Sequence, residues 1–252
     1  MELYKGYVPT KDKQCLEKFK GRKDFKNYDQ VKNLPEFAGI LADGIILVDF
    51  DDPEQAEIMM RIVEDMQFDC RVYQTTRGRH FLFKNTTVEK CGTKVKLACG
   101  LTADIKLGSK NSYEILKFDG EERFIEWDVA NPGDDVQEIP KWLIPIHSRT
   151  DFFHLEAGEG RNSALYGYIL TLTNAGYSRD ESRQCLEIIN KYVLPEPLDA
   201  DELDVIMRDD AFPADTFYNG KAFLHNNFAL FLKNNENIKR INGQLHIFKD
   251  GC

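Results

Sequence analysis

The segment GIILVDFDDPEQAE, residues 44–57, limits the possible folds of this chain more than any other segment. Residues 45–50 are apolar enough to form a strand that is buried on both faces near its start. Asp52 and Pro53 are typical of a helix N-cap and first helical residue, and Glu54 places a negative charge beside the positive helix end. The segment therefore predicts a buried strand followed at once by a helix. The apolar stripe of that helix comprises Ile58, Ile62, Val63 and Met66.

Short strands separated by turn signals are expected up to residue 127. CRVYQTT and RHFLF form a predicted β-hairpin around Arg77 and Gly78, and ADIKLG is a further strand. NSYEILKF and ERFIEW flank Asp119-Gly120, a strong signal for a two-residue hairpin. The Pro-containing stretch NPGDDVQEIPKWLIP then indicates the end of the first domain.

The second half of the chain is predicted to be helical, with helices over about 161–175, 179–193 and 200–210. The tail IKRINGQLHIFKDG is typical of a hairpin that turns at Asn242-Gly243. We therefore expect an α+β fold with a strand-rich domain at 1–146 and a small all-α module at 150–215. Residues 216–252 are expected to be a linker and the start of a further region, so that the chain is part of a longer protein.

Composition narrows the class of protein and of partner. Hydrophobic residues make up 42% and charged residues 30%, no segment approaches a membrane span, and the N-terminus lacks a secretory signal, so we expect a cytoplasmic protein without a membrane partner. The net charge of −9 argues against nucleic-acid binding by bulk electrostatics. Residues 1–118 carry 20 Lys and Arg against 18 Asp and Glu, or +2, which leaves 13 against 24, or −11, for the remainder.

Any basic groove should therefore lie in the first half of the chain. The densest candidate is KDKQCLEKFKGRKDFK, which holds the candidate DNA-binding residues Lys11, Lys13, Lys20 and Arg22. The alternative is an ordinary solvated helix face.

Two aspartates of the opening segment are candidate metal ligands. Side chains two residues apart in a strand share a face, so Asp49 and Asp51 are expected to point the same way. Such a pair repels unless it is compensated, and Mg²⁺ or Mn²⁺ takes oxygen ligands of this kind. The alternative is an acidic turn at the end of a strand.

A second motif, TTRGRHFLF, combines groups that bind anions. His80 can donate to a phosphate oxygen, and Arg77 and Arg79 carry planar guanidinium groups. Gly78 allows a ligand to approach the backbone. The alternative is an exposed hairpin turn with a solvated histidine.

The third motif is TADIKLG, in which the strand period places Asp104 and Lys106 on one face and Ile105 and Leu107 on the other. This pattern fits a third carboxylate ligand beside a lysine that contacts a phosphate or a base, or else a simple salt bridge. Together the three motifs match nucleotidyl transfer, in which two metal ions roughly 4 Å apart activate a hydroxyl and stabilise the leaving pyrophosphate.

The order of these motifs resembles that of the archaeo-eukaryotic primase superfamily, in particular the phage and plasmid primase-polymerases. LVDFD is similar to the family's hydrophobic-Asp-x-Asp motif, GRH to its small-x-His motif and ADIK to its hydrophobic-Asp motif. The resemblance implies an RRM-like mixed or antiparallel sheet core with flanking helices. It also implies that Asp49, Asp51 and Asp104 bind two Mg²⁺ or Mn²⁺ ions and that His80 contacts the nucleotide phosphates. Arg77, Arg79 and Lys106 are weaker nucleotide-binding candidates.

Residues 158–210 resemble the helical C-terminal module of such primases through GRN, LPEPLD and ELDVIMR. Arg161 opens the first helix, where a phosphate of DNA can meet the helix N-terminus, although an ordinary capping turn is the alternative. The tail resembles the start of the region that precedes the helicase in poxvirus-type primase-helicases. This resemblance implies a helicase domain in the same, longer chain.

The function expected from the sequence is synthesis and extension of primers on a single-stranded DNA template from NTP or dNTP. The context would be replication of a phage or other mobile element, in the bacterial host cytoplasm. Three alternatives stay open: a gap-filling repair polymerase of the same superfamily, a two-metal nuclease, and a non-catalytic DNA-binding or helicase-loading module.

Overall fold

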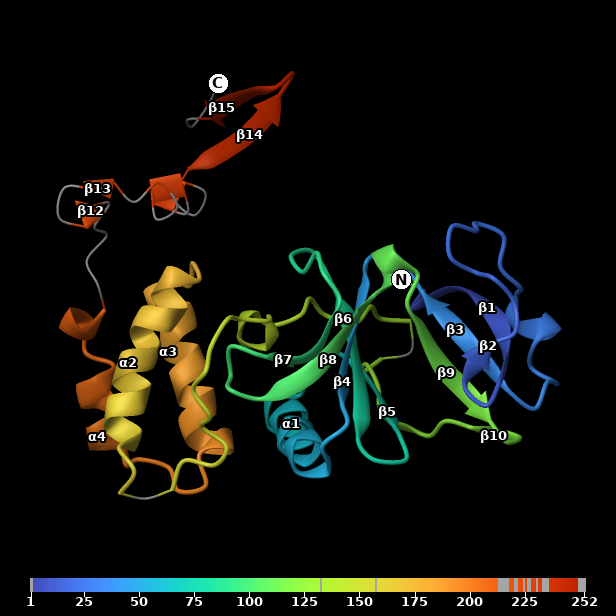
Figure 1. Ribbon diagram of the computed structural model, residues 1–252, viewed down its shortest axis with the longest axis horizontal. Helices are drawn as coiled ribbons and strands as arrows, with labels where there is room; N and C mark the ends of the chain where they lie inside the picture. Colours follow the sequence, from blue (N-terminus) through green and yellow to red (C-terminus); the bar gives the residue numbers. More distant parts are fainter. Residues whose placement is uncertain are drawn as a thin grey trace. The chain divides into compact units, whose positions relative to one another are not determined.

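The computed structural model describes residues 2–131, 133–156, 158–212, 218–219, 222–223, 225, 228–229, 231–232 and 236–248. The chain divides into two compact units, Met1–His147 and Ser148–Cys252. Helices and strands both contribute, and the two large sheets of the first unit are built from antiparallel strand pairs (Figure 1). No helix in the described part of the chain is long and apolar enough to cross a membrane.

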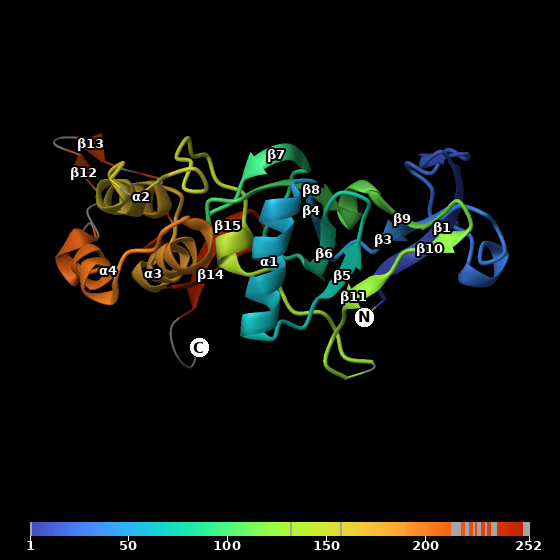
Figure 2. The same ribbon diagram turned by 90° about the horizontal axis from the view of Figure 1, so that it is seen from below.

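A six-stranded sheet forms the centre of the first unit, with strand order β11-β5-β6-β4-β8-β7. Its strands are β4 (Ile45–Phe50), β5 (Arg71–Gln74), β6 (Arg79–Lys84), β7 (Gly92–Lys96), β8 (Thr102–Leu107) and β11 (Ile125–Trp127). All six residues of β4 are buried, as its apolar sequence predicts. Helix α1 (Pro53–Met66) covers the face of this sheet that is turned away from the second sheet (Figures 1 and 2).

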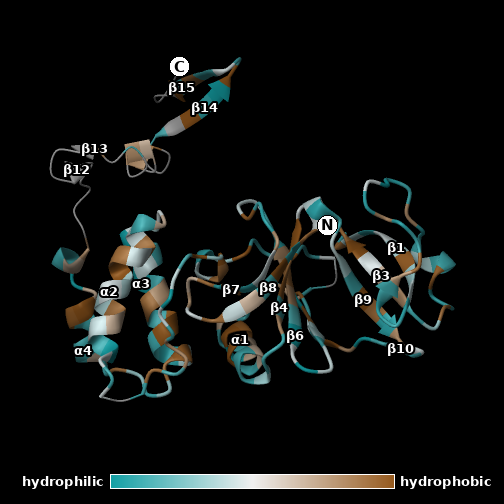
Figure 3. Ribbon diagram, in the orientation of Figure 1, coloured by the Kyte–Doolittle hydropathy of each residue, from teal (hydrophilic) through white to brown (hydrophobic). Residues whose placement is uncertain are grey.

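The second sheet has five strands in the order β10-β9-β3-β1-β2. They are β1 (Tyr4–Lys11), β2 (Gln14–Cys15), β3 (Phe37–Leu41), β9 (Tyr113–Phe118) and β10 (Glu121–Glu122). Tyr4 and Leu41 of this sheet pack in one hydrophobic cluster with Ile45, Leu47 and Leu82 of the first sheet. Figure 3 shows the hydrophobic residues concentrated in the central strands, whereas β10 is hydrophilic. The two sheets therefore share a core, and side chains that face each other across it can meet.

Helix α1 starts where the sequence predicts. Asp52 is the N-cap, and its Oδ1 accepts hydrogen bonds from the backbone N–H groups of Glu54 and Gln55, both at 3.0 Å. Pro53 occupies the first turn, in which no helical partner for its nitrogen is needed. The helix ends at Gln67, which adopts a left-handed conformation with φ of 52°.

One alternative and one local prediction need correction. The lysine-rich segment 11–26 contains no helix, so the alternative of a solvated helix face is wrong; the segment leaves β1 at Lys11, forms the short β2 and then runs as an irregular loop. The hairpin at Asp119-Gly120 is confirmed for β9 and β10, but the predicted strand ERFIEW does not continue along β9. The chain instead crosses after Glu122 to the first sheet, where β11 pairs with β5.

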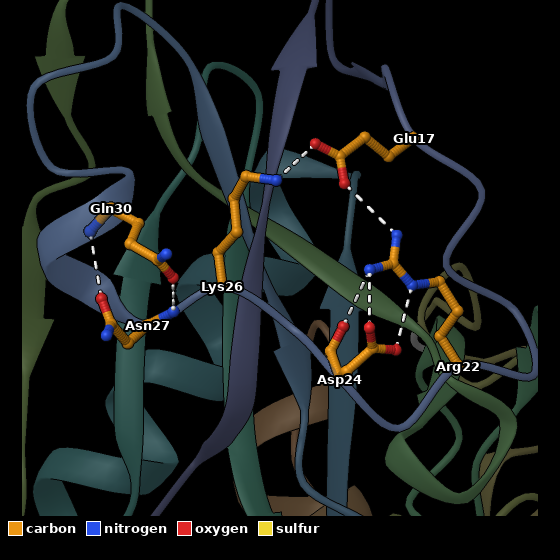
Figure 4. Close-up of polar contacts among 6 residues, drawn as sticks. All are labelled: Glu17, Arg22, Asp24, Lys26, Asn27 and Gln30. Atoms are coloured by element: carbon orange, nitrogen blue, oxygen red, sulfur yellow. Dashed lines mark hydrogen bonds and ion pairs between the residues drawn. The ribbon is translucent and has the colours of Figure 1, made fainter.

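Contacts among its own side chains hold the irregular loop together (Figure 4). Arg22 binds the carboxylates of Asp24 and Glu17, and Lys26 donates to the other oxygen of Glu17 at 2.5 Å. Asn27 then caps the 3₁₀ turn η1 (Tyr28–Gln30) by a reciprocal bond with Gln30. The loop has a defined course without a helix.

Helices α2 (Arg161–Asn174), α3 (Arg179–Ile188) and α4 (Ala200–Ile206) make up the main part of the second unit and confirm the three predicted helices. Residues 189–193 continue α3 as a π-helical turn. The predicted tail hairpin is also confirmed: β14 (Asn237–Ile241) pairs with β15 (Gln244–Phe248) across Asn242-Gly243, and both turn residues have positive φ. A further pair joins β12 (Tyr218–Asn219) to β13 (Ala222–Phe223).

Three short 3₁₀ turns are also present in the described part of the chain: η2 (Gly108–Lys110), η3 (Lys141–Leu143) and η5 (Asp209–Ala211).

The cap at Asp52 can be tested separately from the neighbouring candidate ligands. Asp52→Ala removes the acceptor for two backbone N–H groups and is expected to lower the free energy of unfolding by about 1 kcal/mol, as for other N-caps. Asp52→Asn keeps an acceptor and is the matched control, with a loss of less than about half that amount. Urea unfolding followed by circular dichroism measures both. Equal losses in the two variants would contradict the capping role.

Candidate functional site

The three sequence motifs lie on adjacent strands of the first sheet. In the antiparallel pairing of β4, Asp49 lies opposite His80 of β6 on one side and opposite Asp104 of β8 on the other. Directly paired residues have Cβ atoms about 5 Å apart. The strand register therefore brings together the aspartate, the histidine and the second aspartate that the sequence places far apart.

These side chains point toward the second sheet. Asp49 lies on the same face of β4 as Ile45 and Leu47, which pack in the cluster between the sheets. The intervening Phe50 lies on the α1 side, where its ring meets Phe81 edge-on at 5.6 Å. The alternation predicted for β8 is confirmed, since Asp104 is half-buried between buried neighbours.

His80 is held between two carboxylates. Its Nδ1–H donates to Oε1 of Glu114 at 2.7 Å, because a carboxylate can only accept, and its Nε2 lies 3.1 Å from Oδ1 of Asp49. The second contact is close enough for an ion pair, and Oδ1 has no other polar partner among the described residues. Burial opposes a charge on the imidazole, yet Glu114 and Asp49 raise the pKa of His80 above its ordinary value.

Lys106 is the second partner of Asp49. Its Nζ donates to Oδ2 of Asp49 at 2.6 Å, so Lys106 pairs with Asp49 and not with Asp104, its neighbour on β8. Asp104 instead accepts a bond from the backbone N–H of Lys94 at 2.7 Å. Burial alone would raise the pKa of Asp49, but His80 and Lys106 together lower it to about 2. Asp49 is therefore a buried and ionised carboxylate.

Asp51 is placed differently from Asp49. Strand β4 ends at Phe50, and Asp51 is exposed one residue beyond it, next to the cap of α1. Asp51 adjoins the site at the end of the strand. Its shared face with Asp49 was predicted from the alternation of side chains along a strand, and that alternation ends at Phe50.

The arginines of the second motif do not gather around His80. Arg79 is adjacent to His80 in β6 and therefore faces the opposite side of the sheet, where it binds Glu126 through two bonds of 2.7 and 2.8 Å and Glu57 of α1 at 2.9 Å. Arg77 is exposed in the turn between β5 and β6. The predicted anion site of three converging groups is thus wrong for Arg79, whose guanidinium is already paired.

A cavity of about 520 Å³ opens beside His80. Its walls come from β8, β9, the turn before β9 and the N-terminal loop, and Glu114 is the only carboxylate among the described residues that line it. The Lys, Arg, His and Glu residues of the lining are Lys13, Lys20, His80, Lys106, Lys110, Glu114 and Arg123. The cavity is therefore lined mainly by cations, and His80 and Lys106 are the two residues of the three motifs that line it.

Two of the predicted DNA-binding residues, Lys13 and Lys20, line this cavity. The loop that carries them rests on β9: the ring of Phe19 meets Tyr113 edge-on at 5.4 Å, and the Tyr113 hydroxyl donates to the carbonyl of Lys13. The same loop does not bring Arg22 to the cavity, because its guanidinium binds Asp24 and Glu17 (Figure 4).

The other two candidates for DNA contacts lie elsewhere. Lys11 is exposed at the end of β1. Arg161, in the second unit, donates to the carbonyl groups of Glu196 and Pro197, so its side chain ties the start of α2 to the loop before α4.

A second cavity in the first unit, about 1150 Å³, is larger but does not include the motif residues. It lies between β1, β5 and the segment around Asp128, and two of its cations, Lys5 and Arg71, are paired with Asp43 and Asp128. Size alone would favour it, but the smaller cavity contains the grouped titratable side chains and is the better candidate site.

Among the described residues, no three His, Cys, Asp or Glu side chains gather closely enough to form a metal cluster. Two observations nevertheless fit a cation. Asp49 and Asp104 are paired neighbours, and Oδ1 of Asp49 is buried without a hydrogen-bond partner in the described structure. Carboxylate oxygens are the donors that Mg²⁺ and Mn²⁺ prefer.

Sequence reasoning missed Glu114, Lys110 and Arg123. Glu114 lies in NSYEILKF, where alternation gives it the opposite face from Tyr113 and Ile115, and a lone charged residue on the core-facing side of a strand is the signal that identifies it. Arg123 lies on the crossover between the two sheets, and its Nη1 is buried with no hydrogen-bond partner in the described part of the chain.

The chain matches no protein-family model, and no curated protein or solved structure is significantly similar to it.

The ionised state of Asp49 predicts a specific dependence of stability on pH. Its pKa falls from 3.8 to about 2 on folding, so its charge stabilises the fold above about pH 4, and that contribution is lost as the pH falls toward 2. The shift corresponds to about 2 kcal/mol. The difference in unfolding free energy between the wild type and Asp49→Asn should shrink by about two thirds of that amount on going from pH 5 to pH 2.5, because pH 2.5 is still above the folded pKa of about 2.

Urea unfolding with a chelator present measures this difference. The matched control is Lys110→Met, which removes an exposed lysine of the same cavity and should leave the pH profile unchanged. A difference for Asp49→Asn that stays constant with pH would show that Asp49 is not held ionised by its neighbours.

Proposed function

We propose that this chain is a primase-polymerase of the archaeo-eukaryotic primase superfamily, which synthesises and extends primers on single-stranded DNA by metal-dependent nucleotidyl transfer. The observation that carries the proposal is the pairing of Asp49 with His80 and with Asp104 on three adjacent strands, beside a cavity lined by cations. The motif order in the sequence supports the same family, and the α+β architecture is compatible with it.

Asp49, Asp104 and Asp51 would hold the Mg²⁺ or Mn²⁺ ions. Asp49 offers a buried oxygen without a hydrogen-bond partner in the described structure, Asp104 lies beside it in the sheet, and Asp51 extends from the same strand end. When bound, the two ions supply charge stabilisation for the attacking hydroxyl and for the leaving pyrophosphate. Lys106, which now donates to Asp49, keeps the carboxylate compensated when no ion is bound.

The cavity is suited to the polyphosphate of a nucleotide. Its volume of about 520 Å³ lies within the range of about 300–1,000 Å³ that is usual for small-molecule sites. His80 and Lys106 lie at the inner end, next to the aspartates, while Lys20 and Lys110 are exposed on its wall. Charge-assisted bonds from these groups would hold the phosphates and set the α-phosphate near the metal ligands.

The second unit fits the proposed role of an initiation module. Helices α2, α3 and α4 lie at the positions where the sequence resembles the helical C-terminal module of primases. The proposal therefore includes the single-stranded DNA template as partner, the tail as the start of the region that leads to a helicase domain, and action in the cytoplasm of a bacterial host.

Primer synthesis on single-stranded DNA with labelled NTP or dNTP and Mn²⁺ tests the proposal directly. Asp49→Ala and Asp51→Ala are each expected to reduce synthesis at least about a hundredfold, because each removes a carboxylate required at the metal site. Asp52→Asn, one residue further along, is the control and should retain wild-type synthesis, since it keeps the helix cap. Full activity of either alanine variant would refute the metal assignment.

The same assay separates the competing functions. Degradation of labelled single-stranded DNA without added nucleotide would identify a nuclease. Extension of a supplied primer without synthesis of a new one would identify a gap-filling polymerase. Addition of a chelator should stop synthesis, and excess Mn²⁺ should restore it.

The exposed cavity lysines should act mainly in nucleotide binding. Lys20→Ala and Lys110→Ala are each expected to raise the KM for the nucleotide about 5- to 20-fold with little change in kcat, since they contact phosphates equally in the ground and transition states. Lys32→Ala is the matched control, because Lys32 is exposed outside the cavity and pairs with Asp29. An equal rise in KM for the control would show that the effect is general electrostatics and not the cavity.

A further inference from the structure

We propose that Glu114 is a positioning residue, which orients the imidazole of His80 for its contact with the substrate phosphates. This inference rests on the proposed function, because the role of His80 in nucleotidyl transfer comes from it. It adds a residue that none of the three motifs contains and that comes from the other sheet.

The contact between Glu114 and His80 fixes the direction of both ring nitrogens. Nδ1–H donates to Oε1 of Glu114 at 2.7 Å, and Nε2 is then on the side of Asp49, 3.1 Å from its Oδ1. Both residues line the cavity. Without the bond to Glu114, the imidazole could rotate about χ2 and exchange the positions of its nitrogens. The bond therefore selects the ring orientation that directs Nε2 toward the carboxylate of Asp49.

The burial of Glu114 supports a role in orientation over a role in packing. Only 1% of the residue is exposed, and its Oε2 has no hydrogen-bond partner among the described residues. Removing a carboxylate from water is costly, and an apolar side chain of similar volume would fill the same space without that cost. Its neighbours on the strand, Tyr113 and Ile115, contribute apolar packing on the other face. What Glu114 adds at this position is an acceptor aimed at His80.

The geometry resembles that of the carboxylates that orient metal-binding histidines. Such a histidine donates its second N–H to a carboxylate, which sets the ring orientation, and loss of the carboxylate typically lowers activity about 10- to 100-fold. Here the carboxylate lies across the gap between two sheets, so that the hydrogen bond also links β9 to β6.

Three variants in a primer-extension assay test the role. Glu114→Leu removes the acceptor and should lower kcat about 10- to 100-fold with a smaller change in the KM for the nucleotide. Glu114→Gln keeps a carbonyl acceptor at the same reach and should recover to within about threefold of the wild type. Glu114→Asp keeps the charge but is one methylene shorter, and should behave like Glu114→Leu.

A double-mutant cycle shows whether the effect passes through His80. In a His80→Ala background, Glu114→Leu should cause no further loss of kcat. An independent further loss, or wild-type kcat in both Glu114→Leu and Glu114→Asp, would overturn the proposal. If Glu114→Leu does not fold, as judged by its unfolding midpoint, the comparison of Glu114→Asp with Glu114→Gln decides the same question.

A spectroscopic measurement tests the contact without relying on activity. The ¹⁵N chemical shifts of the His80 imidazole in the full chain should show a proton on Nδ1, and they should change in Glu114→Leu but not in Glu114→Gln. Unchanged shifts in all variants would refute the positioning role even in an active enzyme. Absence of nucleotidyl transfer in the wild type, with the expected shift changes, would refute the proposed function while leaving the contact between Glu114 and His80 established.

Discussion

Asp49 is a carboxylate held almost entirely out of water at the end of the central strand, and its contacts with His80 and Lys106 determine how the site is built. His80 approaches it from β6 and Lys106 from β8, so each neighbouring strand contributes one partner. A buried charge without partners costs several kcal/mol. The burial of Asp49 therefore depends on the two neighbouring strands, because they carry the side chains that compensate its charge. The order of the strands in the sheet thus decides which residues reach the site.

The parts of the structure that follow from local rules could be read from the sequence. The burial of β4, the N-cap at Asp52, the hairpin at Asn242-Gly243 and the alternation along β8 depend on residues close together in the chain. The same alternation rule assigns Arg79 to the face opposite His80. We expected the two side chains to share a site because we placed both beside one turn. Both residues belong to strand β6, in which adjacent side chains point to opposite faces.

Contacts between distant segments could not be predicted in this way. Nothing in the sequence near His80 indicates that Glu114 will face it, because the pairing depends on how two sheets pack. The lysines of the N-terminal segment were recognised as a basic group, but their division into those that line the cavity, such as Lys20, and those bound within the loop, such as Lys26, depends on the contacts of Phe19 and Glu17. The density of lysines identifies the segment in the sequence, but the packing of the loop determines which of these lysines line the cavity.

The origin of His80 and Glu114 in different sheets has a consequence for tolerance to change. A substitution that slides one sheet over the other by about 1 Å, even at the shared cluster around Tyr4 and Leu82, would stretch their bond beyond the normal hydrogen-bond range. The position of the imidazole therefore depends on how the two sheets are aligned. Apolar residues in the interior between the sheets are constrained by the chemistry of the site as well as by stability.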